Sequence, residues 1–171
     1  MVRVAKFEKV SAARFVTDWV HTFPQQTVEQ ALFAYENLKL PVRATSGSAG
    51  YDFFTPVGFE LPAGENIKIP TGIRAVIEKG WVLTLYPRSS LGFKFRFQLD
   101  NSVGVIDSDY ALSDNEGHIF LRMTNDNREG KGLRVPAGMA IAQGIFLPFG
   151  ITVDDDATGI RNGGFGSTTR A

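Results

Sequence analysis

Cysteine is missing from this 171-residue chain, which excludes a disulfide framework and a thiol nucleophile. Histidine is nearly missing as well, because only His21 and His118 could supply an imidazole ring. A zinc site built from histidine and cysteine, of the kind that nucleobase deaminases use, is therefore excluded. The length fits one domain better than two, and the 43% of hydrophobic residues is ordinary for a globular protein.

An excess of charge is also missing. The 18 lysines and arginines are balanced by 18 aspartates and glutamates, so the chain as a whole has no field that would attract nucleic acid. A phosphate ligand would have to be held by local donors. No hydrophobic run approaches the roughly 20 residues that span a membrane, and residues 1–10 lack the apolar core of a signal peptide. We expect no nucleic-acid partner, no membrane partner and a cytoplasmic location.

Short strand-like segments between turn residues are what the chain has in abundance. In the first of them, apolar and polar residues alternate, as in a half-buried strand. Many short strands at regular spacing are typical of a sandwich or barrel, so we predict an all-β fold. The predicted strands cover residues 2–7, 51–55, 66–70, 73–77, 81–86, 103–106, 118–123 and 140–147.

One segment, residues 27–38, is predicted to be a helix. Thr27 and Gln30 stand at the spacing of a capping box, apolar residues recur on one face, and Pro41 follows the end. We interpret it as a helix packed on the barrel or on a neighbouring subunit, and a helix that binds a protein partner is the alternative.

Two segments could hold a phosphate and its counter-ion. Asp52 stands at the start of a predicted strand, where a carboxylate could hold Mg²⁺ through water, although a turn aspartate without a ligand is the plainer interpretation. Arg88, Ser89 and Ser90 stand at a predicted strand-to-helix turn. A guanidinium, two hydroxyls and helix-start amides would make an anion cradle, and an N-capped helix with a surface arginine is an equal alternative.

The segment NSVGVIDSDY, residues 101–110, runs from apolar residues directly into Asp107. A carboxylate at the mouth of a buried strand pair can accept a proton from water. Gly104 would let the backbone approach a flat ligand closely, and the ring of Tyr110 has the right size for a sugar. A β-hairpin with solvated acids at its turn is the alternative.

Two later segments add polar groups. Gln143 is the polar residue of an apolar strand and needs a partner, either backbone or a phosphate. The tail from Arg161 is rich in glycine and hydroxyl groups that can wrap phosphate oxygens, and Phe165 could cover a base or sugar. Its spacing fits neither a Walker A motif nor a dinucleotide fingerprint, and as an isolated tail it would usually be disordered.

Taken in order, these five segments resemble the five motifs of the trimeric dUTP pyrophosphatase (dUTPase) family, in its bacterial and phage form. AGYD, PRSS, NSVGVIDSDY and GGFGST are each close to the family's spelling, and the match runs from about Leu40 to Thr168. The resemblance implies a jelly-roll-like β-barrel and a homotrimer with active sites at the subunit interfaces. The implied reaction is the Mg²⁺-dependent hydrolysis of dUTP to dUMP and pyrophosphate.

The resemblance also implies a role for each segment. Asp107 would be the catalytic base that activates water for attack on the α-phosphorus, and Asp52 would bind Mg²⁺ through water. Tyr110 would pack on the deoxyribose and exclude a 2′-hydroxyl. Uracil would be contacted by Asn101, by the backbone of Gly104, Val105 and Ile106, and by Phe165 of the tail. The phosphate side would be contacted by Arg88, Ser89, Ser90, Gln143, Arg161, Gly166, Ser167 and Thr168.

The chain departs from the family pattern in three places, one of which is that Arg161 stands one residue nearer the Gly163-Gly164 pair than in the commonest spelling. Ala140 stands where the fourth motif usually has an arginine, and Arg122 and Arg134 are candidate substitutes. The stretch from about residue 14 to residue 39 is longer than the family usually has before its first motif.

We therefore predict a β-barrel domain over residues 1–153, with a helical insertion at about 15–39, and a flexible C-terminal arm over residues 154–171. A dCTP deaminase, which shares the fold, is the nearest alternative, although its chemistry needs an amino-group site and a glutamate placed to shuttle protons. The other alternative is a dUTP-responsive regulatory protein that docks a partner through the N-terminal helix.

Overall fold

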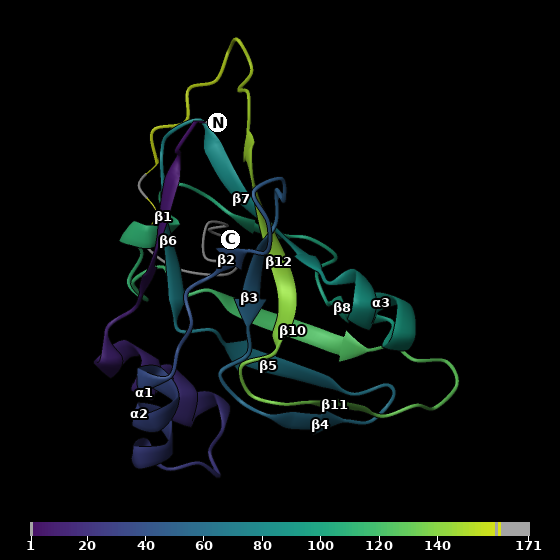
Figure 1. The fold of residues 1–171 in the computed structure, drawn as a ribbon. Coiled ribbons are helices and arrows are strands. Elements are labelled where there is room, and N and C mark those ends of the chain that lie inside the picture. The colour runs from purple at the N-terminus through teal and green to yellow at the C-terminus, as the bar shows by residue number, and fades with distance from the viewer. Residues whose placement is uncertain (1, 160, 162–171) are drawn as a thin grey trace.

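The computed structural model describes residues 2–159 and 161, which form a mostly β fold (Figure 1). In this part of the chain twelve strands make four sheets, together with three α-helices and one short 3₁₀ helix, η1. The strands are β1 Ala5–Lys9, β2 Val42–Arg43, β3 Tyr51–Phe54, β4 Phe59–Leu61, β5 Asn66–Pro70, β6 Ile73–Ile77, β7 Trp81–Pro87, β8 Phe97–Leu99, β9 Gly104–Ile106, β10 Phe120–Asn125, β11 Leu133–Val135 and β12 Ala140–Pro148. The helices are α1 Ala12–Thr22, α2 Val28–Glu36, α3 Ser89–Phe95 and η1 Tyr110–Leu112.

The largest sheet has the order β2-β3-β12-β7-β9, and its neighbouring strands pair antiparallel. Its centre consists of the two long strands β7 and β12, which place Gln143 opposite Tyr86 and Leu147 opposite Val82. This sheet positions the site, because β3, β7, β9 and β12 carry or directly precede the first four predicted motif segments.

Three smaller sheets complete the β structure, in the orders β1-β6, β5-β10-β8 and β11-β4. Within the described residues these pairings do not close into one barrel, so the predicted β-rich fold is confirmed, whereas the jelly-roll-like barrel is not. Gly64 and Gly138 have φ angles of 86° and 78°, which glycine adopts without strain, and each turn carries the chain from one sheet into another.

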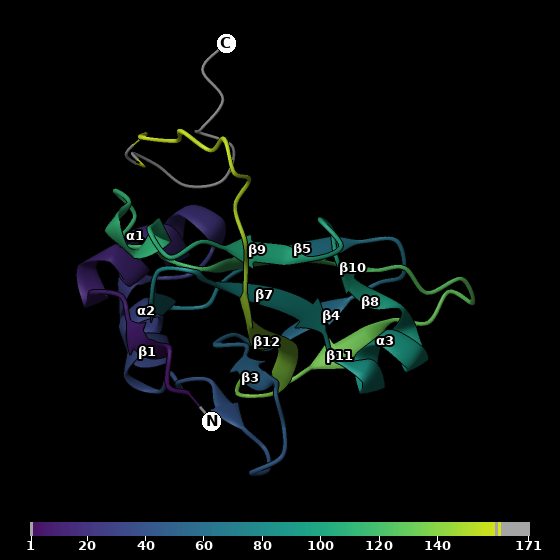
Figure 2. The same ribbon diagram turned by 90° about the horizontal axis from the view of Figure 1, so that it is seen from above.

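Two helices precede β2, where the sequence predicted one. Helix α2 lies within the predicted 27–38 and begins at the expected capping box, in which Thr27 and Gln30 exchange side-chain-to-backbone hydrogen bonds. Helix α1 was not predicted, and it begins at Ser11, whose hydroxyl accepts a hydrogen bond from the Arg14 N–H at 3.1 Å. The fold is therefore mostly β rather than all-β. Helices α1 and α2 lie together on one side of the molecule and α3 on the other (Figures 1 and 2).

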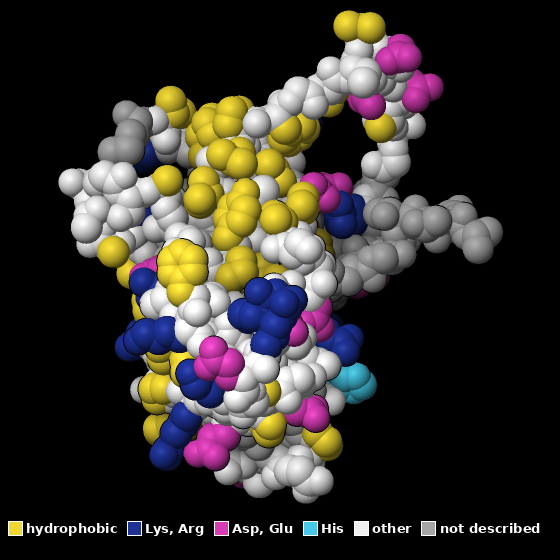
Figure 3. All heavy atoms as spheres, turned by 90° about the vertical axis from the view of Figure 1, so that its right-hand side faces the viewer, with side chains coloured by type: hydrophobic (Ala, Val, Ile, Leu, Met, Phe, Trp, Pro, Cys, Tyr) yellow, Lys and Arg dark blue, Asp and Glu magenta, His cyan; other side chains and the backbone are white. Residues whose placement is uncertain are grey.

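Hydrophobic side chains gather on the surface that faces right in Figure 1. Figure 3 shows them over the upper part of this face, where β7 and β12 rise. Leu147 at the end of β12 and Phe149 just beyond it are among the exposed large hydrophobic residues. None of the helices in residues 2–159 is long and apolar enough to cross a membrane.

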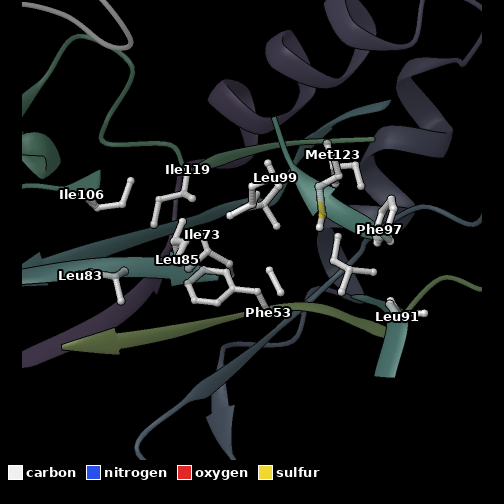
Figure 4. Packing of buried hydrophobic residues seen from close by; sticks show 14 of the residues in the cluster. Phe53, Ile73, Leu83, Leu85, Leu91, Phe97, Leu99, Ile106, Ile119 and Met123 are labelled. Carbon is white, nitrogen blue, oxygen red and sulfur yellow. The ribbon is translucent and has the colours of Figure 1, made fainter. Parts of the chain in front are cut away.

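Two buried clusters hold the fold together. The main cluster lies between the sheets and includes Phe53, Leu83 and Ile106 (Figure 4). The second cluster is centred on Phe15 and Trp19 of α1, which are 0% and 2% exposed, and α2 closes it. Burying one such side chain stabilises the fold by roughly 1.5–3 kcal/mol. The N-terminal helices are therefore an integral part of the folded domain.

Candidate active site

Three polar side chains meet between β3 and β12, and we call Asp52, Arg88 and Gln143 the β3–β12 cluster. Asp52 lies opposite Gln143 in the strand register, and Arg88 Nη1 lies 3.4 Å from Asp52 Oδ2. The Asp52 and Arg88 side chains are 19% and 37% exposed, so a ligand can reach this pair. Gln143 Nε2 donates to the Pro87 carbonyl at 3.2 Å, which is the backbone partner that a polar residue in an apolar strand needs.

Gly50 leaves room for the Gln143 side chain. A Cβ at position 50 would lie 2.7 Å from Gln143 Oε1, so a larger residue would displace this amide. At Gly47, in the same loop, a Cβ would have nothing within 4 Å. The glycine of AGYD therefore serves the fourth motif segment through space, a relation that the sequence alone did not indicate.

Helix α3 begins at the predicted strand-to-helix turn. Arg88 is its N-cap residue and makes no side-chain capping hydrogen bond, and the first turn holds no acidic residue. Ser89 and Ser90 follow and are exposed. Uncapped amides, two hydroxyls and a guanidinium together favour an anion here.

The segment of residues 101–110, hereafter the 101–110 loop, is anchored through β9. Gly104 pairs with Leu85 and Ile106 with Leu83 of β7, while Asn101 is exposed and Val105 points away from the core. A Cβ at Gly104 would lie 3.1 Å from Leu85 Cβ, so the close approach that this glycine permits is strand packing. We had expected it to serve a flat ligand.

A cavity of about 320 Å³ opens beside the 101–110 loop. Asn101, Gly104 and Ile106 line it together with Lys68 of β5 and Phe120 of β10. The ammonium of Lys68 lies 4.5 Å from the centroid of the Phe120 ring. An apolar wall with a few polar groups is typical of a small-molecule site. The sequence did not single out Lys68 or Phe120, because only the pairing of β5 with β10 brings them to this place.

Asp107 and Asp109 follow β9, and their side chains are 50% and 47% exposed. Arg161 bridges them, with Nη2 on Asp107 Oδ2 and Nε on Asp109 Oδ1, the latter at 2.8 Å. Its guanidinium carbon lies 5.8 Å from the centroid of the Tyr110 ring. The first residue of the fifth segment thus contacts the third segment of the same chain, whereas we had expected it on phosphate.

Tyr110 is buried, with 4% of its surface exposed. Its hydroxyl donates to the His118 carbonyl at 2.9 Å and accepts from Asn115 Nδ2 at 2.9 Å. Burial raises the pKa of the Tyr110 hydroxyl, so the hydroxyl remains a donor at neutral pH.

The β3–β12 cluster and the 101–110 loop lie at different places along β7. Gln143 is opposite Tyr86, whereas Ile106 is opposite Leu83. Three residues along a strand span roughly 10 Å. Phe165, Gly166, Ser167 and Thr168 lie outside the described residues.

The candidate substitutes for the missing motif arginine are engaged elsewhere. Ala140 is buried opposite Phe54 at the start of β12. Arg122 pairs with Asp100 at 3.0 Å beside the cavity, and Arg134 of β11 pairs with Glu60 of β4 at 3.3 Å. Both partners belong to the smaller sheets or to their connections.

The residues that the structure describes hold no group of three or more histidines, aspartates and glutamates that could enclose a metal ion. Asp52, with one half-buried carboxylate, could hold a divalent cation only with water or with oxygens of a bound ligand. That arrangement is the one Mg²⁺ prefers.

Comparison with known proteins identifies a family. The sequence model of the dUTPase family matches residues 36–169. A deoxyuridine 5′-triphosphate nucleotidohydrolase of Lactococcus lactis is 42% identical over 139 residues, covering 78% of this chain and 91% of the relative. The crystal structure of a dUTPase from Streptococcus mutans superposes with a TM-score of 0.63 at 36% identity, covering 87% of this chain and 98% of the other. A Staphylococcus phage 80α dUTPase has the same fold, with a TM-score of 0.63 at 18% identity over 94% of this chain and 100% of the other.

Proposed function

Because the chain belongs to the dUTPase family, we propose that it hydrolyses dUTP to dUMP and pyrophosphate at a site that combines the β3–β12 cluster with the 101–110 loop. The observation that carries this proposal is the composition of the two places. One has an exposed cation, hydroxyls and helix amides for phosphates, and the other has a carboxylate near a cavity of about 320 Å³.

In this proposal Asp107 is the catalytic base. Its half-exposed carboxylate accepts a proton from water as the water oxygen bonds to the α-phosphorus, and the bond from that phosphorus to the bridging oxygen of pyrophosphate breaks. The Arg161 guanidinium, which contacts the Asp107 carboxylate, holds this side chain in place within the 101–110 loop.

The phosphates need neutralisation of charge more than covalent help. We assign this task to Arg88, to the hydroxyls of Ser89 and Ser90, and to Gln143. Mg²⁺ would be held through water near Asp52, and when bound it would supply a further positive charge at the phosphate oxygens. Arg88, which already contacts the Asp52 carboxylate, would orient it for that role.

The base and the sugar belong to the other half of the site. We assign uracil to the cavity, with the Asn101 side chain and the backbone of residues 104–106 as its polar contacts. Pairing with main-chain groups would leave no room for the methyl group of thymine. The ring of Tyr110 would lie against the deoxyribose and exclude a 2′-hydroxyl.

We further propose the family's jelly-roll-like arrangement and a homotrimer whose sites combine parts of different subunits. The distance along β7 between the two halves supports a shared site, and the hydrophobic surface in Figure 3 supports an interface. The arm from residue 154 onward would complete the site with its glycine-rich segment. Light scattering should give three times the 18.8 kDa of one chain, and a monomer would contradict this part.

A pyrophosphate-release assay with dUTP, dTTP, dCTP and UTP, with and without Mg²⁺, tests the activity. We expect turnover of dUTP only, and only with Mg²⁺. Turnover of all four substrates, or of none, would reject the proposal, and release of ammonia from dCTP would favour the deaminase alternative.

A further inference from the structure

Helix α1 lies outside the residues that match the dUTPase family, yet two side-chain contacts tie it to residues 110–118 within the match. Asp18 Oδ2 lies 2.6 Å from His118 Nδ1. At the start of the helix, the Ser11 N–H and hydroxyl each donate to the Glu116 carboxylate at 2.7 Å. Helix α1 thus holds the connection that follows the 101–110 loop, although α1 contains none of the family's motifs.

The hydrogen bonds around the His118 ring fix its tautomer. The ring is fully buried, and its Nε2 accepts from the Gly72 N–H at 2.8 Å. Because a backbone N–H can only donate, the ring proton sits on Nδ1 and is donated to Asp18. A carboxylate that receives this proton fixes the orientation of the imidazole ring, as second-layer carboxylates do for other functional histidines.

The backbone of the same histidine holds Tyr110. The Tyr110 hydroxyl donates to the His118 carbonyl, and Asn115 Nδ2 donates to that hydroxyl. The connection also packs tightly on η1, since a Cβ at Gly117 would lie 2.6 Å from Ala111 Cα. A shift of residue 118 would therefore be transmitted directly to the Tyr110 ring.

We propose that Asp18 and His118 are positioning residues for Tyr110, and that helix α1 thereby takes part in the discrimination between deoxyribose and ribose. This inference rests on the proposed function, in which the Tyr110 ring lies against the sugar. Rejection of a 2′-hydroxyl depends on where the ring stands, and a displacement of about 1 Å can change a rate by roughly a hundredfold. Asp18 sets that place from a helix that contacts neither substrate nor reacting atoms.

The test compares kcat/KM for dUTP and for UTP in variants whose folding is checked by thermal unfolding. The wild type comes first: if it does not turn over dUTP, the proposed function fails, independently of any variant. In Asp18→Ala the buried Nδ1–H of His118 loses its acceptor. We expect the ratio of kcat/KM for UTP to kcat/KM for dUTP to rise about tenfold, mainly through a change in KM. Asp18→Asn keeps an acceptor oxygen and should restore most of the discrimination.

Two further variants separate positioning from simple docking of the helix. Glu116→Gln weakens the second contact of α1, the one between Ser11 and Glu116. It should leave the ratio of kcat/KM for UTP to that for dUTP unchanged, even where it lowers the melting temperature. Tyr110→Phe removes the hydroxyl that reaches His118 without touching α1, and it should shift the ratio in the same direction as Asp18→Ala. The inference is overturned by an unchanged ratio in folded Asp18→Ala or in Tyr110→Phe, or by an equal shift in Glu116→Gln.

Discussion

In the β3–β12 cluster, Arg88 and Asp52 keep 37% and 19% of their side-chain surface exposed, and Arg88 leaves its helix start uncapped. Around Tyr110 the opposite holds. The His118 ring has no exposed surface, and hydrogen bonds engage both its nitrogens and its carbonyl. The groups assigned to the phosphates are left reachable, whereas the groups that hold the Tyr110 ring in place are buried and hydrogen-bonded. The comparison predicts that changes in the first region act on binding of the phosphates, and that changes in the second act on shape and stability.

Asp107→Asn should have the largest effect, because Asp107 is the proposed base. We expect kcat to fall about a thousandfold with dUTP binding largely kept, since loss of a general base costs roughly 10²–10⁴ in rate. Pyrophosphate release and calorimetric binding of dUTP measure the two effects. The matched control is Asp109→Asn, because Asp109 is equally exposed and shares Arg161. Comparable losses in both variants would remove the special role of Asp107.

Phe15→Ala tests the claim that α1 belongs to the fold. Phe15 is fully buried against Trp19, Tyr35 and His118, so the free energy of unfolding should fall by about 3–5 kcal/mol. Phe33→Ala is the control, since Phe33 on α2 is 70% exposed and should change stability by under about 0.5 kcal/mol. Equal denaturation midpoints for the two variants would contradict this picture of the N-terminal helices.

Gly50→Ala tests the reachable region. The new Cβ would meet Gln143 Oε1 at 2.7 Å and displace this amide from its place beside Asp52. We expect KM for dUTP to rise about tenfold, which corresponds to the loss of about 1.4 kcal/mol of binding, while the ratio of UTP to dUTP stays constant. At Gly47 an added Cβ would have nothing within 4 Å, so Gly47→Ala should behave as wild type. A change of sugar discrimination in Gly50→Ala would show that the two regions do not act independently.

Much of the fold could be predicted from local patterns. The capping box at Thr27 and the apolar runs of β5, β6, β7 and β12 are patterns of neighbouring residues, and the structure has these elements near the predicted bounds. Helix α1 was missed because its start signal, Ser11, comes only two residues after a strand, and the residue at the third helical position is Arg14 rather than the glutamate or glutamine of a capping box. The barrel could not be settled from the sequence, because sheet closure depends on pairings between distant strands, which no local pattern shows.

The site was predictable where residues adjoin in sequence, as in the 101–110 loop and the turn at Arg88. Contacts between distant segments were not predictable. Asp18 and His118 stand 100 residues apart, and Gly50 reaches Gln143 only through the β3–β12 pairing. No local pattern marks such pairs, since each residue alone is an ordinary turn glycine, helix aspartate or buried histidine.

Acid should weaken the buried region by a small and specific amount. Burial alone would raise the pKa of Asp18, but the hydrogen bond from His118, together with Arg14, outweighs it and holds the pKa below its ordinary value of 3.8. A carboxyl whose pKa is lowered by folding stabilises the protein above its unfolded-state pKa, and this contribution is lost as the pH falls through the folded-state pKa.

The wild type should therefore melt about 2–4 °C above Asp18→Asn near pH 6, where the difference is largest. The difference should shrink below about pH 4. Differential scanning calorimetry between pH 3 and pH 6 measures it. Glu8→Gln is the reference, because the pKa of Glu8 is also lowered, by Lys6, but on an exposed surface where salt screens the pair. Adding 0.5 M salt should abolish the effect of Glu8→Gln and leave that of Asp18→Asn. Equal sensitivity to salt would mean that the Asp18–His118 contact is as accessible to solvent as the surface pair, which its burial argues against.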